Sequence, residues 1–137
     1  MRRAAITCLL VASTAVHADA RDLRPVPTAP IHDPLYIDPA SVRRSGAQVS
    51  FRYILDVPVA YEAPTTSRRW KSNEMDAVID CDRRTYSIGN ILAHSGPQGT
   101  GRVVGRYSST AEERKPAPIV AGGTFDYLAR DLCPAKR

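Results

Sequence analysis

The sequence is poor in the residues that build most catalytic and metal sites. It holds 3 histidines and 3 cysteines in 137 residues. Two of the histidines lie in an N-terminal leader and in a proline-rich stretch, and His94 opens a glycine-rich turn. A nucleophile–histidine site needs a base held by rigid neighbours, and zinc needs a set of thiolate or imidazole ligands. We therefore expect no catalytic residues, no metal site and no cofactor.

Long apolar runs are also scarce. The run at residues 4–16 is too short to anchor a chain across a hydrocarbon core of ~30 Å, and no later stretch is more apolar. It follows Arg2 and Arg3 and precedes alanines at signal-peptidase spacing, ending at Ala18 or Ala20. A buried N-terminal helix fits this pattern less well than a leader does. We predict a secretory signal peptide over residues 1–20 and no transmembrane anchor.

Removing the leader changes the cysteine count. Cys8 lies inside the apolar run and lacks the preceding residues of a lipid-attachment site, so the mature chain keeps Cys81 and Cys133. An even pair in an exported protein predicts a disulfide. Both mature thiols are then committed to this bridge.

Lysine is rare, and arginine carries most of the positive charge. The whole chain has a formal net charge of +5, and its lysines are Lys71, Lys115 and Lys136. Arginine favours planar contacts with carboxylate, phosphate or sulfate groups. A mild basic excess in an exported protein does not indicate a nucleic-acid partner.

Three arginine doublets stand out. They lie at predicted turns or strand ends, and they are Arg43-Arg44, Arg68-Arg69 and Arg83-Arg84. If they converge on one edge of a sheet, they can bind a sulfated or phosphorylated polymer or an acidic protein patch. Scattered charge that keeps the chain soluble and blocks edge pairing explains them as well. They are the candidate ligand-binding residues.

The mature chain divides into an arm and a domain. Residues 21–34 contain four prolines and predict an extended, hydrogen-bond-poor and mobile arm. Residues 35–137 form the domain. Its first strand is expected at 35–38, ended by Pro39 and followed by a turn at 43–46. Alternating apolar residues over 47–57 predict a half-buried strand.

Further strands are expected after residue 68 up to Cys81, at 85–92 and at 102–108. In the first of these Met75, Ala77 and Ile79 point inward and Glu74 outward. The glycine-rich stretch His94–Gly101 predicts a turn with a solvated histidine.

Apolar residues at helical spacing predict a helix over 124–132, with Thr124 as its N-cap and Cys133-Pro134 at its end. The expected fold is α+β and mainly β. It has a small antiparallel sheet of five or six strands and a C-terminal helix tied on by the Cys81–Cys133 disulfide.

The domain resembles the surface-adhesin protein E family of Gram-negative bacteria. The resemblance covers residues 35–133 and rests on Tyr36-Ile37-Asp38-x-x-Ser41, Lys71-Ser72, Ile79-Asp80-Cys81, Arg83-Arg84-x-Tyr86 and the closing cysteine. It implies an antiparallel sheet with a disulfide-tied helix, and attachment to host matrix or serum proteins. Two departures are the missing lipid-attachment cysteine and a Phe51 or Tyr53 where the family often has tryptophan.

These features predict a non-enzymatic exported binding module, periplasmic or secreted. Adhesin-like attachment to host matrix, or to another protein or polyanionic ligand outside the cytoplasm, is the leading hypothesis. The alternative is a small periplasmic inhibitor or accessory factor of an envelope enzyme, acting through a loop such as His94–Gly101.

The leader generates a prediction about processing. Because small residues end at Ala18 and Ala20, we expect the mature protein to begin at Asp19 or Arg21. Intact-mass measurement of the exported protein checks this. A retained Met1 would contradict export through this leader.

Overall fold

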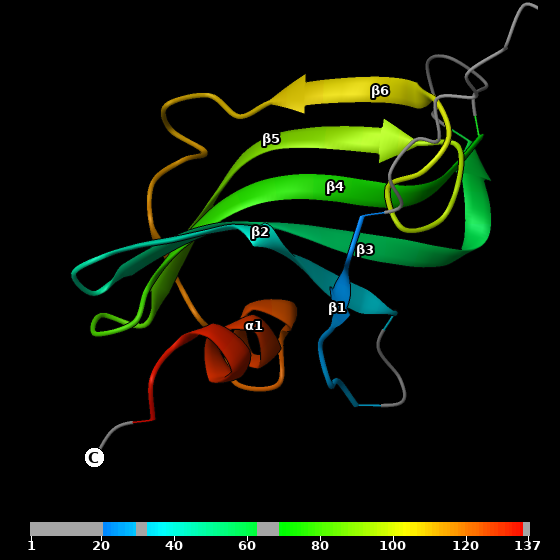
Figure 1. Cartoon of the computed structure of the whole chain (residues 1–137). Coiled ribbons are helices and arrows are strands. Elements are labelled where there is room, and N and C mark those ends of the chain that lie inside the picture. Colours follow the sequence, from blue (N-terminus) through cyan, green and yellow to red (C-terminus); the bar gives the residue numbers. More distant parts are fainter. Residues whose placement is uncertain (1–20, 30–32, 63–68, 136–137) are drawn as a thin grey trace, which may run out of the picture.

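The computed structural model describes residues 21–29, 33–62 and 69–135. The predicted signal peptide and Arg68 therefore lie outside the described residues. In the described part, seven strands form one antiparallel sheet in the order β1-β2-β3-β4-β5-β6, and β7 pairs with β5 (Figure 1). Their bounds are β1 Arg24–Pro25, β2 Leu35–Ser45, β3 Gln48–Glu62, β4 Arg69–Asp80, β5 Thr85–His94, β6 Val103–Ser108 and β7 Ala117–Pro118. This confirms the expected fold class.

One helix, α1 (Thr124–Leu132), lies against one side of the sheet. Its predicted apolar face is confirmed, because Phe125, Leu128, Ala129 and Leu132 are all buried. They pack on inward residues of the strands, chiefly Val49, Phe51, Tyr53, Met75, Ala77 and Ile79. The Phe125 ring stacks on Tyr86 at 3.7 Å between centroids and meets Tyr53 edge-on at 5.6 Å. Burying aromatic rings together stabilises the fold beyond their area alone.

The start of the helix differs from the prediction. Thr124 is already helical, and Gly123 precedes it without a side-chain cap. A carboxylate in the first turn instead holds the segment before the helix, since Asp126 Oδ2 accepts a hydrogen bond from the Gly122 N–H at 3.0 Å. The predicted end is correct, because Cys133 terminates the helix before Pro134.

The first long strand does not stop at Pro39. β2 continues to Ser45, with a register shift between Asp38 and Arg43. A bulge tolerates proline because the ladder is already interrupted there. The Ser41 hydroxyl donates to the Asp38 carbonyl at 2.6 Å and accepts the Arg52 N–H at 2.8 Å. One side chain thus bridges the gap in the backbone ladder, and the turn moves to Gly46-Ala47.

The arm is attached to the sheet, so the expected mobility is wrong for residues 24–26. Arg24 and Pro25 pair with β2, and the Val26 N–H donates to the Leu35 carbonyl at 2.8 Å. Val26 is buried, and the Arg24 guanidinium lies 2.6 Å from the Asp131 carboxylate of α1. Proline restricts the backbone but leaves the flanking residues able to pair.

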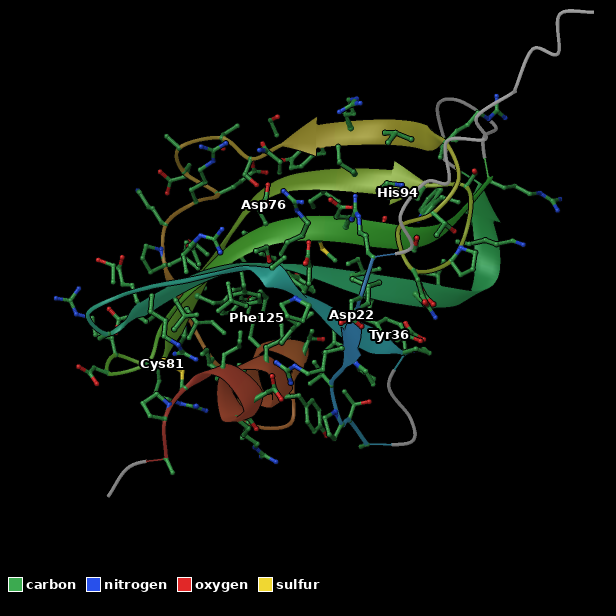
Figure 2. All side chains as sticks on the ribbon, viewed as in Figure 1. Asp22, Tyr36, Asp76, Cys81, His94 and Phe125 are labelled. Atoms are coloured by element: carbon green, nitrogen blue, oxygen red, sulfur yellow. A yellow bond between two sulfur atoms is a disulfide. The ribbon has the colours of Figure 1, made fainter. Side chains whose placement is uncertain are left out.

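The disulfide is confirmed between Cys81, directly after β4, and Cys133, at the end of α1. Figure 2 shows Cys81 at the end of the sheet where the two long hairpins turn. The bridge closes a separation of 52 residues, so it limits the unfolded chain strongly.

We therefore expect the Cys81→Ser/Cys133→Ser variant to lose ~4 kcal/mol of unfolding free energy through the relaxed unfolded state. Its melting temperature should fall by more than about 10 °C. Thermal denaturation of the variant, with reduced wild-type protein as the control, measures the effect. Equal melting of oxidised and reduced protein would show that the bridge contributes nothing.

Candidate ligand-binding surface

The sheet has two unlike faces. The face covered by α1 is apolar, and Figure 2 shows Phe125 between the helix and the strands. The opposite face, called the distal face below, carries the alternate residues of each strand. There Arg52 pairs in register with Asp76, and Ile54 with Glu74. Because side chains alternate along a strand, covering one face with a helix directs these polar groups to the other.

A buried ionic cluster lies on the distal face. Glu74 is 4% exposed, and its carboxylate contacts three basic groups. It forms an ion pair with Arg21, lies 3.2 Å from Arg52 Nε and lies 3.2 Å from His94 Nε2. A carboxylate this deep requires such partners, since an unpaired buried charge is costly. Glu74 lies on the outward side of β4 as expected but is buried there, and the expectation of a solvated His94 is wrong.

His94 is buried because β5 runs two residues further than predicted, which pairs His94 with Ser72 of β4. The sequence signal that was available is the polar residue at every second position of β4, at 72, 74 and 76. That pattern indicated a solvent-facing side. It did not show that a loop would cover part of it.

The loop after β5 folds back over this cluster. The Ser72 hydroxyl donates to the Gly96 carbonyl at 2.6 Å and accepts the Gly99 N–H at 2.9 Å. The Asp56 carboxylate accepts the Gln98 N–H at 2.6 Å. Burial raises the pKa of the Asp56 carboxyl, and the Gln98 N–H partly offsets this effect. The loop is therefore fastened to the sheet by its backbone.

Gly99 explains why this loop is rich in glycine. Its φ is +68°, and a Cβ added there would lie 3.3 Å from the Glu74 carboxylate. Gln98 beside it also has a positive φ of 54°. A left-handed backbone is available to glycine at little cost, and a larger residue at 99 would press on the buried cluster.

The arginine doublets do not converge on one edge. The Arg43-Arg44 and Arg83-Arg84 pairs lie at the same end of the sheet. Ser45, next to the first pair, and Asp80, just before the second, are both in register with Gln48 of β3. Arg69 begins β4, at the opposite end of that strand.

Two doublet members hold α1 to the sheet. Arg44 donates to the Leu132 carbonyl at the end of the helix at 2.7 Å. Arg84 donates to Asp126 in the first turn of the helix, also at 2.7 Å. Arg84 does this from a left-handed backbone with a φ of 55°, a conformation that costs a non-glycine residue ~1 kcal/mol or more. The sequence pattern of charges at turns did not reveal this structural role.

Asp126 is the buried acceptor of this clamp. It is 3% exposed and binds Arg84 through one carboxylate oxygen and Arg130 through the other. The Gly122 N–H, followed by the Arg84 hydrogen bond, holds the pKa of the Asp126 carboxyl below its usual range. The ionised form is thus favoured by the folded state.

The distal face is hollowed beside the covered cluster. One hollow, of about 730 Å³, is lined by residues of β2, β3, β4 and β5 and by Arg114 from the segment after β6. A second, of about 280 Å³, reaches β6 and includes Arg106 and Tyr107. The two hollows share Arg52, Asp76 and Asn90. Figure 2 shows Asp76 midway along the strands, away from α1.

Among the described residues, no group of three or more histidine, cysteine or acidic side chains is placed to hold a metal ion. Within the same part of the chain, no helix is long and apolar enough to cross a membrane.

These features define a small disulfide-bonded module with a helix on one side of an antiparallel sheet and a polar, arginine-lined hollow on the other. The sequence profile of the Surface-adhesin protein E family matches residues 25–134, so the chain belongs to this family. No curated protein matches the chain in sequence.

Solved structures of Haemophilus influenzae protein E share the fold. One has a TM-score of 0.61 at 16% identity, covering 83% of this chain and 88% of that one. Another, from non-typeable Haemophilus influenzae, has a TM-score of 0.60 at 16% identity, covering 88% and 81%. At this identity the likeness concerns the fold alone.

The helix clamp generates a prediction about pH. Folding lowers the pKa of the Asp126 carboxyl. The ionised carboxylate therefore contributes its full stabilisation above its unfolded pKa of ~4, and this stabilisation is lost as the pH falls from there through the lower pKa of the folded state. We expect Arg84→Gln to reduce the unfolding free energy by about 1 to 2 kcal/mol at neutral pH. The loss should shrink below about pH 4.

Urea unfolding of Arg84→Gln at neutral and acid pH measures this difference. Arg83→Gln is the matched control, because the Arg83 side chain forms no hydrogen bond or ion pair with the described residues, and it should change stability by less than about 0.5 kcal/mol. A penalty for Arg84→Gln that is the same at both pH values would contradict the clamp.

Proposed function

We propose that this protein is a non-enzymatic, exported adhesin-like module that attaches to acidic or polyanionic partners outside the cytoplasm. The family match over residues 25–134 carries this proposal. The predicted leader and the disulfide support export, since such bridges persist in oxidising compartments.

The placement of the arginines supports an acidic partner. Arg44 and Arg84 are used inside the molecule, whereas the side chains of Arg83, Arg102, Arg106 and Arg114 form no hydrogen bond or ion pair with the described residues. Arg84 is half-buried, and the other five arginines are exposed. Exposed guanidinium groups attract carboxylate and sulfate groups and bind them in planar pairs.

The geometry of His94 supports a non-enzymatic role. Its side chain is 6% exposed, and the imidazole lies against Glu74 beneath the 95–101 loop. A general base must reach the proton that it removes from a substrate, and this imidazole faces a buried carboxylate. The loop itself directs three backbone groups into the molecule, which favours the adhesin-like function over an inhibitor that inserts this loop into an enzyme.

The proposal predicts salt-dependent attachment. We expect the mature protein to bind a heparin-coated surface, and its affinity to fall at least about tenfold between ~50 mM and ~300 mM salt, because exposed charges are screened within about a Debye length. Surface plasmon resonance on heparin, with a neutral dextran surface as the control, measures this. Salt-independent binding would indicate an apolar partner site and contradict the proposal.

Cell fractionation separates this function from the alternative. Exposure to added protease on intact cells is expected for an adhesin. A protein that is protected until the outer membrane is opened would favour the periplasmic accessory role.

A further inference from the structure

We propose that the two adjoining hollows of the distal face form one binding groove, and that it takes an acidic oligosaccharide, a sugar chain bearing carboxylate or sulfate groups. This inference rests on the proposed function and names its site and ligand class.

The groove is continuous and elongated. The two hollows share Arg52, Asp76 and Asn90, so a ligand passes from one to the other over the middle of the sheet. From β2 to β6 the groove crosses four strand spacings, which is about 19 Å. This span suits an extended chain better than a single small molecule.

Cationic groups line both hollows of this groove. Arg43 and Arg114 line the first hollow, and Arg106 lines the second. The side chains of Arg106 and Arg114 form no hydrogen bond or ion pair with the described residues, and both residues are exposed. Each can bind a carboxylate or sulfate through two parallel hydrogen bonds.

The middle of the groove is not purely cationic. Asp38 and Asp76 line the first hollow, and the Asp76 side chain is 49% exposed although it accepts from Arg52 at 3.3 Å. Glu74, at the edge of the second hollow, is neutralised by Arg21 and Arg52. An acidic ligand that lies along the groove therefore also meets the carboxylate oxygens of these residues, which require hydrogen-bond donors from the ligand.

This arrangement discriminates between acidic ligands. A sugar chain offers hydroxyl donors to the two aspartates and acidic acceptors to the arginines, whereas the side chains of an acidic peptide offer acceptors only. Serine and asparagine side chains in the lining can both donate and accept, and they are Ser50, Ser87 and Asn90. The ring of Tyr107, a residue 48% exposed, lines the second hollow and offers an apolar surface to a sugar ring. Its hydroxyl is held by Glu113.

The test is calorimetric titration of the mature protein with a heparin-derived hexasaccharide. We expect Arg106→Gln/Arg114→Gln to weaken binding about tenfold, because two charge-assisted pairs are removed. The matched control is Lys71→Gln/Lys115→Gln, which removes the same charge from exposed side chains that line neither hollow. It should change the affinity by less than about twofold. Equal losses of affinity in the two variants would overturn the proposal that this groove binds the ligand.

A second variant tests the sugar chemistry. If the ligand is recognised only as a polyanion, Asp76→Ala should tighten binding by removing a negative charge. If sugar hydroxyls donate to this carboxylate, Asp76→Ala should weaken it, and that is the result we expect. Thermal melting verifies that the variant is folded, which Arg52 supports through its remaining contact with Glu74. Tighter binding to the variant would overturn the proposal.

Hexaglutamate is the comparison ligand, and we expect it to bind at least about tenfold more weakly than the hexasaccharide. Equal affinity for both would overturn the sugar assignment. If the protein attaches to matrix proteins but does not bind the hexasaccharide, the groove inference fails and the proposed function stands. If it binds neither, both fail.

Discussion

The attachment of one amphipathic helix to one face of the sheet is the constraint on which the rest of this structure depends. Four contacts hold α1 in place besides its apolar face: the Cys81–Cys133 bridge, Arg44 on the Leu132 carbonyl, Arg24 on Asp131, and Arg84 on Asp126. The first three act at the C-terminal end of the helix, and the fourth acts in its first turn. Because the helix is fixed at both ends, the sheet has one dry face, and its other face is left to polar chemistry.

Arginine has two separate roles in this chain. Inside the molecule it neutralises buried carboxylates, as Arg84 does for Asp126 and as Arg21 and Arg52 do for Glu74. On the surface it remains available to ligands, as at Arg106 and Arg114. A planar, permanently charged group with several donors serves both purposes. A count of basic residues therefore overstates the charge that the protein offers to a partner.

The proposed function and the groove follow from the same division of the sheet. A family that is defined by surface adhesion shares this fold, and the distal face is where this chain has space, exposed arginines and hydrogen-bonding side chains together. The end of the sheet where Arg44 and Arg84 lie holds the helix instead. The buried Glu74 cluster and the loop over it limit the groove on one side and hold its floor in place.

The sequence alone determined most of the secondary-structure elements, because these depend on local patterns. Apolar alternation over 47–57 and helical spacing over 124–132 are patterns among residues close together in the sequence. The helix lies where it was expected, and β3 begins where it was expected but continues past Pro58 to Glu62. The cysteine pair was also evident, since Cys81 and Cys133 are the two cysteines outside the predicted leader. The continuation of β2 past Pro39 was missed because the bulge is bridged by the Ser41 hydroxyl, which accepts a hydrogen bond from the Arg52 N–H eleven residues further along the chain.

The roles of Arg84, Glu74 and His94 were decided only by the tertiary structure. Whether a charged side chain is solvated or buried depends on which segment covers it. Arg84 contacts a helix residue 42 positions later in the sequence, and Glu74 is covered by a loop whose Gly99 is 25 positions later. Long-range packing sets the dielectric surroundings and the partners of a charge, and local sequence carries no record of either.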